Sequence, residues 1–360
     1  MGSALTLRSP VWLETNTRLK KRLKQLDALR AVAVLLVLGC HVTWHPLWVR
    51  CGWTGVDLFF VLSGFLIAGL LFREYKSHNR IHLCRFIERR ALKIYPAYYV
   101  LLIATVAYEL LRGGRLLWST IWPDLLFVQN YRIGMWPHLW SLGTEEQFYL
   151  LLPFALVLLT LRKQAAPFEC IPAASLSIMG ICLLSRVLWA FSTHHPSSWF
   201  PGCIRGIDGL ALGVMISYFH EFEPQKLDWV SHERLPLLLI SLLCLLPAIA
   251  YPFEHRFMQT IGLTLLYVGY AGLLLFYLRF VHSEGKVIGA FAFVGSYSYT
   301  IYLFHMPVAD HFVSGLAPYV GRTSLFALYV ALSITLGIVV AKLVERPVLR
   351  IRERLLPSRI

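Results

Sequence analysis

Arg30 and His41 are the two residues of this sequence best placed to do chemistry, because both are ionisable and both lie in the apolar stretch 29–48. Ionisable side chains are costly in hydrocarbon, so an arginine at the start of such a stretch and a histidine inside it are expected to be functional. Eleven helical steps of about 100° make roughly three turns, which places both side chains on one face about 16 Å apart. That face would carry a fixed cation near one membrane boundary and a titratable imidazole within the membrane.

Further ionisable and polar side chains are expected at the membrane depth of His41. Asp57 lies near the start of the second apolar stretch, and Glu145 and Glu146 lie near the start of the fourth. These three carboxyls and His41 form the expected catalytic group. The residues expected to line the same region are Ser141, Tyr149, Arg205, Asp208, Tyr302 and His305. Since polar groups inside a membrane indicate function by default, this convergence predicts one site.

Transfer of an acyl group to an alcohol is a reaction that this set could perform. It requires a base for the hydroxyl proton, a binding site for an anionic donor and stabilisation of a tetrahedral oxyanion. His41 is the candidate base because imidazole can be neutral at working pH. Glu145 or Glu146 could orient the ring and stabilise the imidazolium. The alternative for His41 is a hydrogen bond that merely joins two helices.

The elements that position these residues are predicted to be transmembrane helices. Of the 360 residues, 57% are hydrophobic and 15% are charged, and windows of about 20 apolar residues recur along the chain. We therefore expect an all-α integral membrane protein built as a bundle of about ten spans. The expected spans are 29–48, 53–72, 94–111, 138–160, 171–191, 202–219, 235–250, 259–278, 288–308 and 323–343.

The distribution of Lys and Arg predicts that both termini are cytoplasmic. Most of the 34 Lys and Arg residues lie in the N-terminal tail, the loop 73–93, the later inner loops and the C-terminal tail. Segments rich in Lys and Arg face the cytoplasm. The net charge of +14 is therefore mainly a topology signal, and we expect no nucleic-acid partner because no such binding motif accompanies it.

Three parts of the chain are predicted: a basic cytoplasmic tail (1–28), a transmembrane domain (29–344) and a second basic tail (345–360). The first apolar stretch is long enough to cross the membrane and lacks a small-residue cleavage site, so we expect it to be retained. The seven cysteines form no C-x-x-C pattern and are interpreted as packing residues.

Several short motifs follow one another along nearly the whole chain. They are Leu26-Asp27-Ala28-Leu29-Arg30 with His41 downstream, GVDLFFVLSGFLI (55–67), Arg89-Arg90 with KIYP (93–96), Trp140-Ser141-Leu142, EEQFY (145–149), RGIDG (205–209), SYSY (296–299) with His305, and Glu345-Arg346-Pro347. In this ordered set the chain resembles the membrane-embedded acyltransferase-3 family of bacterial O-acyltransferases.

The resemblance implies transfer of an acyl group, with acetyl as the default, from cytoplasmic acyl-CoA to a hydroxyl of a cell-envelope or exported glycan. It implies a multi-pass protein of the bacterial inner membrane whose partners are acyl-CoA, a glycan or lipid-linked saccharide, and the bilayer. Acyl-CoA, by default acetyl-CoA, would be a co-substrate, and neither a permanent cofactor nor a metal is expected. In that family an arginine and a histidine with ten residues between them are tied to activity, and this pair maps onto Arg30 and His41.

The expected donor-binding residues are basic and lie on the cytoplasmic side. They are Arg30, Arg85, Arg89, Arg90 and Lys93. The family's Arg-x-x-Arg motif maps onto Arg90 and Lys93, and the lysine keeps the charge but lacks the planar fork that grips a phosphate. For Arg85 and Arg89 the positive-inside rule alone is an equally good explanation.

A proton-coupled secondary transporter is the alternative function, with His41, Asp57, Glu145 and Glu146 as a proton relay. Transporters of this kind often contain paired halves, and this sequence has no internal repeat.

Two other patterns have mainly structural interpretations. Ser63 and Gly64 resemble a nucleophile setting, but a Ser-Gly pair in a transmembrane helix more often allows close helix approach. His41 and His45 could bind a metal from one helix face, yet no third ligand occurs at a matching spacing.

Overall fold

The computed structural model describes residues 11–41, 46–162, 164–192, 204–281 and 285–357. In these ranges the regular elements are helices, so the predicted all-α fold is confirmed. The first half of the chain contains α1 (Val11–His41), α2 (Pro46–Cys51), α3 (Gly55–His78), α4 (Leu83–Leu111), α5 (Trp118–Leu125), α6 (Trp140–Leu161) and α7 (Ile171–Ser192). The second half contains α8 (Ile207–Phe222), α9 (Arg234–Ala250), α10 (Leu263–Phe280), α11 (Lys286–Gly295), α12 (Ser298–Pro307), α13 (Arg322–Val340) and α14 (Arg346–Leu355).

Six helices in the described residues are long and apolar enough to cross a membrane, and the number rises to eight if each of two bent helix pairs is one span. Two of the expected spans fall outside this set. The stretch 29–48 includes residues 42–45 and the stretch 202–219 includes 202 and 203, which lie outside the described residues. The helix that begins in the second stretch, α8, has 16 residues. The orientation of the termini remains a prediction.

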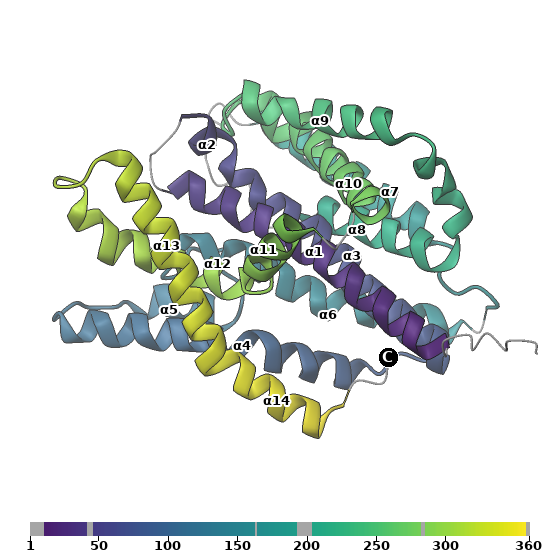
Figure 1. Cartoon of the computed structure of the whole chain (residues 1–360), viewed down its shortest axis with the longest axis horizontal. Coiled ribbons are helices and arrows are strands. Elements are labelled where there is room, and N and C mark those ends of the chain that lie inside the picture. The colour runs from purple at the N-terminus through teal and green to yellow at the C-terminus, as the bar shows by residue number, and fades with distance from the viewer. Residues whose placement is uncertain (1–10, 42–45, 163, 193–203, 282–284, 358–360) are drawn as a thin grey trace, which may run out of the picture.

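α1 runs through the middle of the molecule in Figure 1, between the group α7 to α10 on one side and α4, α5 and α13 on the other. It contacts α3, α11 and α12. α3 lies behind it and packs most closely on α8. The residues on α1 and α3 are therefore surrounded by protein, which is where ionisable groups in a membrane protein are tolerated.

Two glycines set the distance between α3 and α8. A Cβ atom at Gly64 would lie 2.1 Å from the Leu210 carbonyl oxygen, and one at Gly213 would lie 2.3 Å from the Val61 carbonyl oxygen. Because each clash would be with backbone, only a residue without a side chain fits at either position. The prediction of close helix approach at Gly64 is confirmed.

α11 and the helical segment Ser298–Leu316 form a bent pair, with an angle of 60° between them. Within that segment Pro307 is the last residue of α12, and a π-helix follows over Val308–Val313. Proline lacks the backbone N–H that would bond to the carbonyl four residues earlier. The break and the proline together shape the part of the chain that carries Tyr302 and His305.

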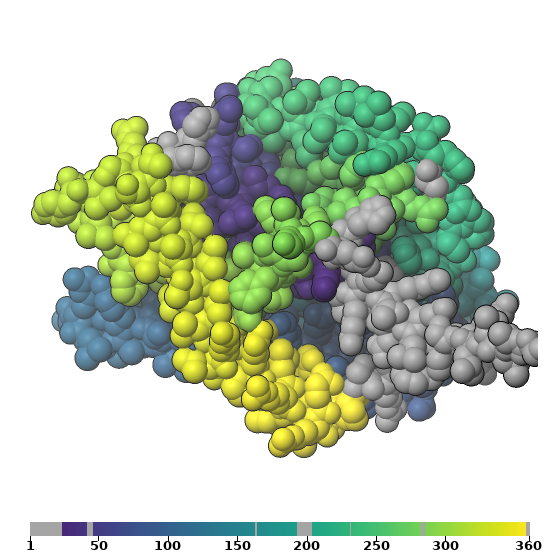
Figure 2. Space-filling model, viewed as in Figure 1, coloured from purple at the N-terminus to yellow at the C-terminus, as the bar shows by residue number. Residues whose placement is uncertain are grey.

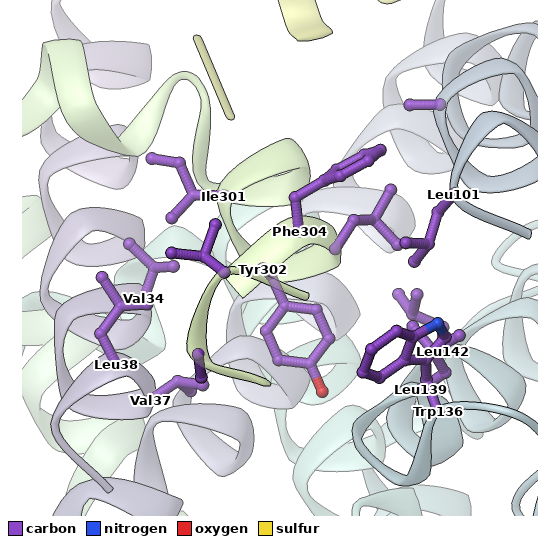
Figure 3. Close-up of a cluster of buried hydrophobic side chains, with 14 of the residues drawn as sticks. Val34, Val37, Leu38, Leu101, Trp136, Leu139, Leu142, Ile301, Tyr302 and Phe304 are labelled. Atoms are coloured by element: carbon purple, nitrogen blue, oxygen red, sulfur yellow. The ribbon is translucent and has the colours of Figure 1, made fainter. Parts of the chain in front are cut away.

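An apolar cluster surrounds Tyr302 where α1, α4, α6 and α12 meet. In Figure 3 Tyr302 lies between Val34, Val37 and Leu38 of α1 and the group Trp136, Leu139 and Leu142. These side chains are buried, so the Tyr302 hydroxyl is held away from bulk water.

At the C-terminal end of the chain, α13 and α14 form a ridge across the face of the molecule seen in Figure 2.

Candidate active site

A cavity of about 60 Å³ lies between α1, α3, α6 and α12. Its polar lining consists of Arg30, Ser63, Ser141, Glu145, Ser298, Tyr299 and Tyr302. Val56, Phe59 and Leu142 supply the apolar lining. The sequence placed four of these polar residues in the site, Arg30, Ser141, Glu145 and Tyr302, and the structure brings them to one cavity.

Glu145 is the acidic residue of the cavity. The Ser63 hydroxyl donates to its Oε1 at 2.9 Å, and the Tyr149 hydroxyl donates to its Oε2 at 2.8 Å. Each carboxylate oxygen therefore has a fixed donor, and the orientation of the carboxyl is set by α3 and by its own helix. Ser63 belongs to this arrangement as a hydrogen-bond donor.

Ser141 and Tyr302 lie on the other side of the cavity lining. Their hydroxyl oxygens are 2.7 Å apart, and the Tyr302 hydroxyl donates to the His138 carbonyl at 2.5 Å. Tyr302 is followed one helical turn later by His305. The cavity is thus joined through Tyr302 to a group of histidine rings.

His41 belongs to this histidine group. Its ring centroid lies 4.9 Å from that of His305, and the His305 centroid lies 4.8 Å from that of His138. His305 is completely buried, whereas His41 is exposed at the end of α1. In the described part of the chain no group of three His, Cys, Asp or Glu residues is arranged to hold a metal ion.

The structure does not bring Glu145 or Glu146 to His41. Glu145 is bonded to Ser63 and Tyr149, and Glu146 lies beside Tyr95 and Arg90. No contact joins either glutamate to His41 among the described residues. The expected Glu–His pair is replaced here by a pair of histidine rings.

Asp57 is held in an ion pair. Arg205 donates to its two carboxylate oxygens at 3.2 and 2.7 Å, and the Tyr267 hydroxyl donates to it at 2.9 Å. The Arg205 guanidinium lies over the rings of Trp53, Trp140 and Phe253 at 4.7 to 5.0 Å. Asp57 therefore anchors the start of α8 to α3, a positioning arrangement rather than that of a free base.

Asp208 has a similar partner. The buried Arg186 of α7 donates to it at 2.6 Å and to the Thr264 hydroxyl oxygen at 2.7 Å. This ion pair joins α7, α8 and α10 in the membrane interior. A buried pair costs desolvation energy, but removing one partner leaves an uncompensated charge, so both residues are needed for the packing of these helices.

Three of the five expected donor-binding cations contact the C-terminal segment of the chain. The contacts are Lys93 with Glu345, Arg89 with Glu353 at 2.9 Å, and Arg85 with the carbonyl of Pro357. Because these cations already have acceptors, they are poorer candidates for an incoming phosphate than cations without one.

Arg30 and Arg90 are the other two cations. Arg30 lines the cavity, and its one ion pair among the described residues, with Asp27, is 3.5 Å long. Arg90 stacks on the rings of Phe86 and Tyr149 at 5.7 and 5.6 Å and has no carboxylate partner within 4 Å among the residues that the structure describes. These two guanidinium groups can bind the anionic part of a ligand.

His138 was given no role from the sequence, although it lies in the same motif as Ser141. It belongs to a single 3₁₀ turn (Pro137–Leu139) before α6, and its ring packs on those of Tyr302 and His305. The one signal for it was a histidine at the start of a predicted span. A second cavity, of about 750 Å³, lies between α8, α9 and α10, and its lining is largely apolar.

Comparison with known proteins assigns the chain to a family. A family model described as an acyltransferase domain matches residues 23–342. The chain belongs to this acyltransferase family. The resemblance to the acyltransferase-3 family is thereby confirmed, and family membership favours acyl transfer over the alternative of secondary transport.

Two relatives among the curated proteins are O-acetyltransferases. The chain is 29% identical over 323 residues to the peptidoglycan O-acetyltransferase OatA of Listeria monocytogenes, an alignment that covers 80% of this chain and 50% of that protein. It is 30% identical over 210 residues to the O-acetyltransferase OatA of Staphylococcus aureus, covering 54% of this chain and 34% of that protein. The chain spans about half the length of the first of these relatives and about a third of the length of the second. No solved structure matches the chain.

Proposed function

We propose that this acyltransferase moves an acetyl group from acetyl-CoA to a hydroxyl of a cell-envelope glycan, with His41 as the general base. The observation that carries the proposal is the order of the polar groups along the bundle. Arg30, Glu145 and Tyr302 line one cavity. Arg90 stacks on Tyr149, which donates to Glu145, and His305 and His41 follow beyond Tyr302. The names of the relatives, one of which acts on peptidoglycan, support a glycan as acceptor.

The donor would enter from the cytoplasmic side. CoA carries several phosphate charges, and guanidinium groups bind phosphate oxygens through short, charge-assisted hydrogen bonds. Arg30 and Arg90 supply such groups where the positive-inside rule places the cytoplasm. The slim pantetheine arm would then pass through the cavity, where Glu145 and Ser63 offer acceptors to its amide N–H groups.

The acceptor would be met at the His41 end. In the neutral state His41 takes the proton of the acceptor hydroxyl as its oxygen attacks the thioester carbonyl carbon. Collapse of the tetrahedral intermediate breaks the carbon–sulfur bond, and the CoA thiolate takes the proton back from His41. The products are the O-acetyl ester and CoA, with no net change in protons, so direct transfer needs no acyl-enzyme intermediate.

The buried ion pairs would serve the scaffold of this reaction. Asp57 with Arg205, and Asp208 with Arg186, tie α8 to α3 and to α7. We propose that they position the helices that enclose the cavity, while the cytoplasmic location of both termini follows from the charge distribution. The protein would work in the bacterial inner membrane.

The test is a transfer assay with purified protein in lipid nanodiscs, radiolabelled acetyl-CoA and an N-acetylglucosamine oligosaccharide as the acceptor probe. We expect labelled O-acetyl ester on the saccharide and an equal amount of free CoA. The ester should disappear after mild alkaline hydrolysis, which an amide would survive. Labelled product that is an amide, or CoA release without any ester, would contradict O-acetyl transfer.

A further inference from the structure

We propose that His305 is the positioning residue of His41: its Nε2 accepts the N–H of the His41 ring when His41 carries the acceptor's proton. The inference rests on the proposed role of His41 as base and adds the group that orients it. Sequence reasoning gave this task to Glu145 or Glu146, neither of which contacts His41 among the described residues. The inference depends on which nitrogen of each buried ring carries a proton.

The tautomer of His305 follows from its hydrogen bond. Its Nδ1 lies 2.5 Å from the carbonyl oxygen of Tyr302, one turn earlier in α12. A carbonyl oxygen can only accept, so Nδ1 is the nitrogen that carries the hydrogen in the neutral ring. Nε2 is then an unprotonated acceptor. It is fully buried and has no hydrogen-bond partner among the described residues.

The tautomer of His138 follows from a proline. Pro307 has no N–H, so the carbonyl of Leu303, four residues earlier, lacks its usual helical donor. The Nε2 of His138 lies 3.3 Å from that carbonyl oxygen and supplies the missing donor. Its Nδ1 is therefore unprotonated and is also buried without a partner. His138 has no second N–H to donate to His305.

The remaining neighbour of His305 with a hydroxyl is also excluded as a donor to Nε2. The Tyr302 hydroxyl donates to the His138 carbonyl at 2.5 Å. Of the rings around His305 that the structure describes, only His41 remains with an N–H to give. An unpaired buried acceptor is costly, and the N–H of His41 on the nitrogen that faces away from the acceptor hydroxyl would satisfy it. This hydrogen bond becomes charge-assisted, and so stronger, when His41 becomes an imidazolium.

The consequence is that proton uptake and orientation are coupled in one ring pair. With one His41 nitrogen bonded to His305, the other is directed towards the acceptor hydroxyl. Hydrogen bonding to the charged form of a base favours that form. The negative charge of Asp310, on the π-helix after α12, also favours the charged form of His41. Asp310 is kept in every variant described below, so its effect is the same in all of them.

Two matched substitutions separate orientation from packing. The terminal amide of Gln in His305→Gln reaches the position of Nε2 and offers an oxygen acceptor there. The shorter Asn in His305→Asn reaches only the position of Nδ1, so it can keep the bond to Tyr302 but leaves His41 without an acceptor. His311→Gln is the control, because His311 lies six residues further along the chain, on the π-helix after α12, in ring contact with Tyr108.

The readout is the labelling of His41 by diethyl pyrocarbonate, which reacts with neutral imidazole, followed by peptide mass spectrometry over a range of pH. In His305→Asn we expect the midpoint of the pH dependence to move about one pH unit lower, because the imidazolium loses its acceptor. His305→Gln should restore most of the shift, and His311→Gln should match the unchanged protein. In the transfer assay, kcat of His305→Asn should fall about 10- to 100-fold with an unchanged KM for acetyl-CoA.

Equal midpoints in the Asn variant and the unchanged protein would overturn the inference, as would equal shifts in Asn and Gln. The labelling needs no acyl transfer, so it decides the role of His305 independently of the proposed function. The proposed function fails separately, if a variant without His41 still transfers acetyl groups at the normal rate.

Discussion

Arg30 is the basic residue whose surroundings most favour donor binding. It lines the cavity beside Glu145, and its side chain is one-third exposed with a single long ion pair to Asp27. For Arg85 and Arg89 the sequence could not separate donor binding from the positive-inside rule, because position relative to the membrane was all that could be inferred. Their contacts with the C-terminal segment could not be foreseen, since they join residues about 260 to 270 positions apart.

Replacing Arg30 by alanine is expected to weaken acetyl-CoA binding about 10- to 100-fold, since a charge-assisted hydrogen bond to phosphate is lost. Binding of the saccharide probe should stay within about twofold. Isothermal titration with acetyl-CoA measures this directly. Arg112→Ala is the matched control, because Arg112 is exposed and contacts only Tyr108 among the described residues. Unchanged donor affinity in the Arg30 variant would remove it from the donor site.

The pairing of Arg30 with His41 could be predicted because both lie on one helix, where spacing alone fixes the relative direction of side chains. The partners of Glu145 could not, because they depend on how α6 lies against α3. His138 could be assigned only after the carbonyl left unpaired by Pro307 was located in space. Residues on one helix are thus predictable together, whereas contacts between helices require the fold.

At the scale of elements, the contact between α3 and α8 fixes the positions of several polar residues at or near the site. α3 presents Asp57 and Ser63, and α8 begins just after Arg205. The sequence predicted a close helix approach at Gly64 but not which helix would make it. It did not predict that α8 is only 16 residues long, nor that α11 and α12 are bent by 60°, because hydropathy measures apolar length and not direction.

Gly64→Ala should destabilise the protein by roughly 2 kcal/mol or more, because the added methyl group would meet the backbone of α8 and the helices must separate. The measurement is the thermal unfolding midpoint in detergent. Gly180→Ala on α7 is the matched control, since a Cβ there meets no atom within 4 Å. Its midpoint should be equal or slightly higher. A Gly64 variant as stable as the control would contradict the close approach.

α5 and the loop after it form an element outside the spanning helices that packs against α4. The buried Asp124 of α5 accepts a hydrogen bond from the Met135 N–H at 2.6 Å, and its backbone carbonyl accepts one from the Tyr98 hydroxyl. Burial raises the pKa of Asp124 from 3.8 to about 7. The carboxyl is therefore neutral in the fold at mildly acidic pH.

This raised pKa predicts a loss of stability with rising pH. In the unfolded chain Asp124 ionises near its ordinary pKa of 3.8, so the neutral folded form contributes fully below that pH. The contribution falls between pH 4 and 7 as the unfolded state alone gains charge, and is on the order of 3 kcal/mol. The thermal midpoint should drop over this range, and Asp124→Asn should flatten the drop. An identical slope in both proteins would exclude Asp124 as the cause.

At the scale of the whole molecule, the polar groups form a line through an otherwise apolar bundle. Arg90 lies within electrostatic range of Arg30 and of Arg352 in α14, Arg30 lines the cavity, and His41 is the last residue of α1. Composition and charge predicted that the molecule is a helical membrane protein. They could not show that the line is continuous, because its middle is assembled from α3, α6 and α12.

This architecture predicts that donor and acceptor are used from opposite sides. In sealed vesicles with one protein orientation, established by protease access to the C-terminal tail, acetyl-CoA on the side of that tail should support transfer. The N-acetylglucosamine oligosaccharide should be acetylated only on the other side. Transfer that requires both substrates on the side of the tail would contradict this path through the bundle.

The rate of acetyl transfer by His41→Ala is the most direct test of His41 as the base. The rate is measured with acetyl-CoA and the saccharide probe at saturating concentrations, and His255→Ala, at an exposed histidine between α9 and α10, is the control. Loss of a general base predicts a rate about 100- to 10,000-fold lower, with an unchanged thermal midpoint and unchanged acetyl-CoA binding. A His41→Ala protein that transfers acetyl groups at the rate of the control would contradict the proposed mechanism.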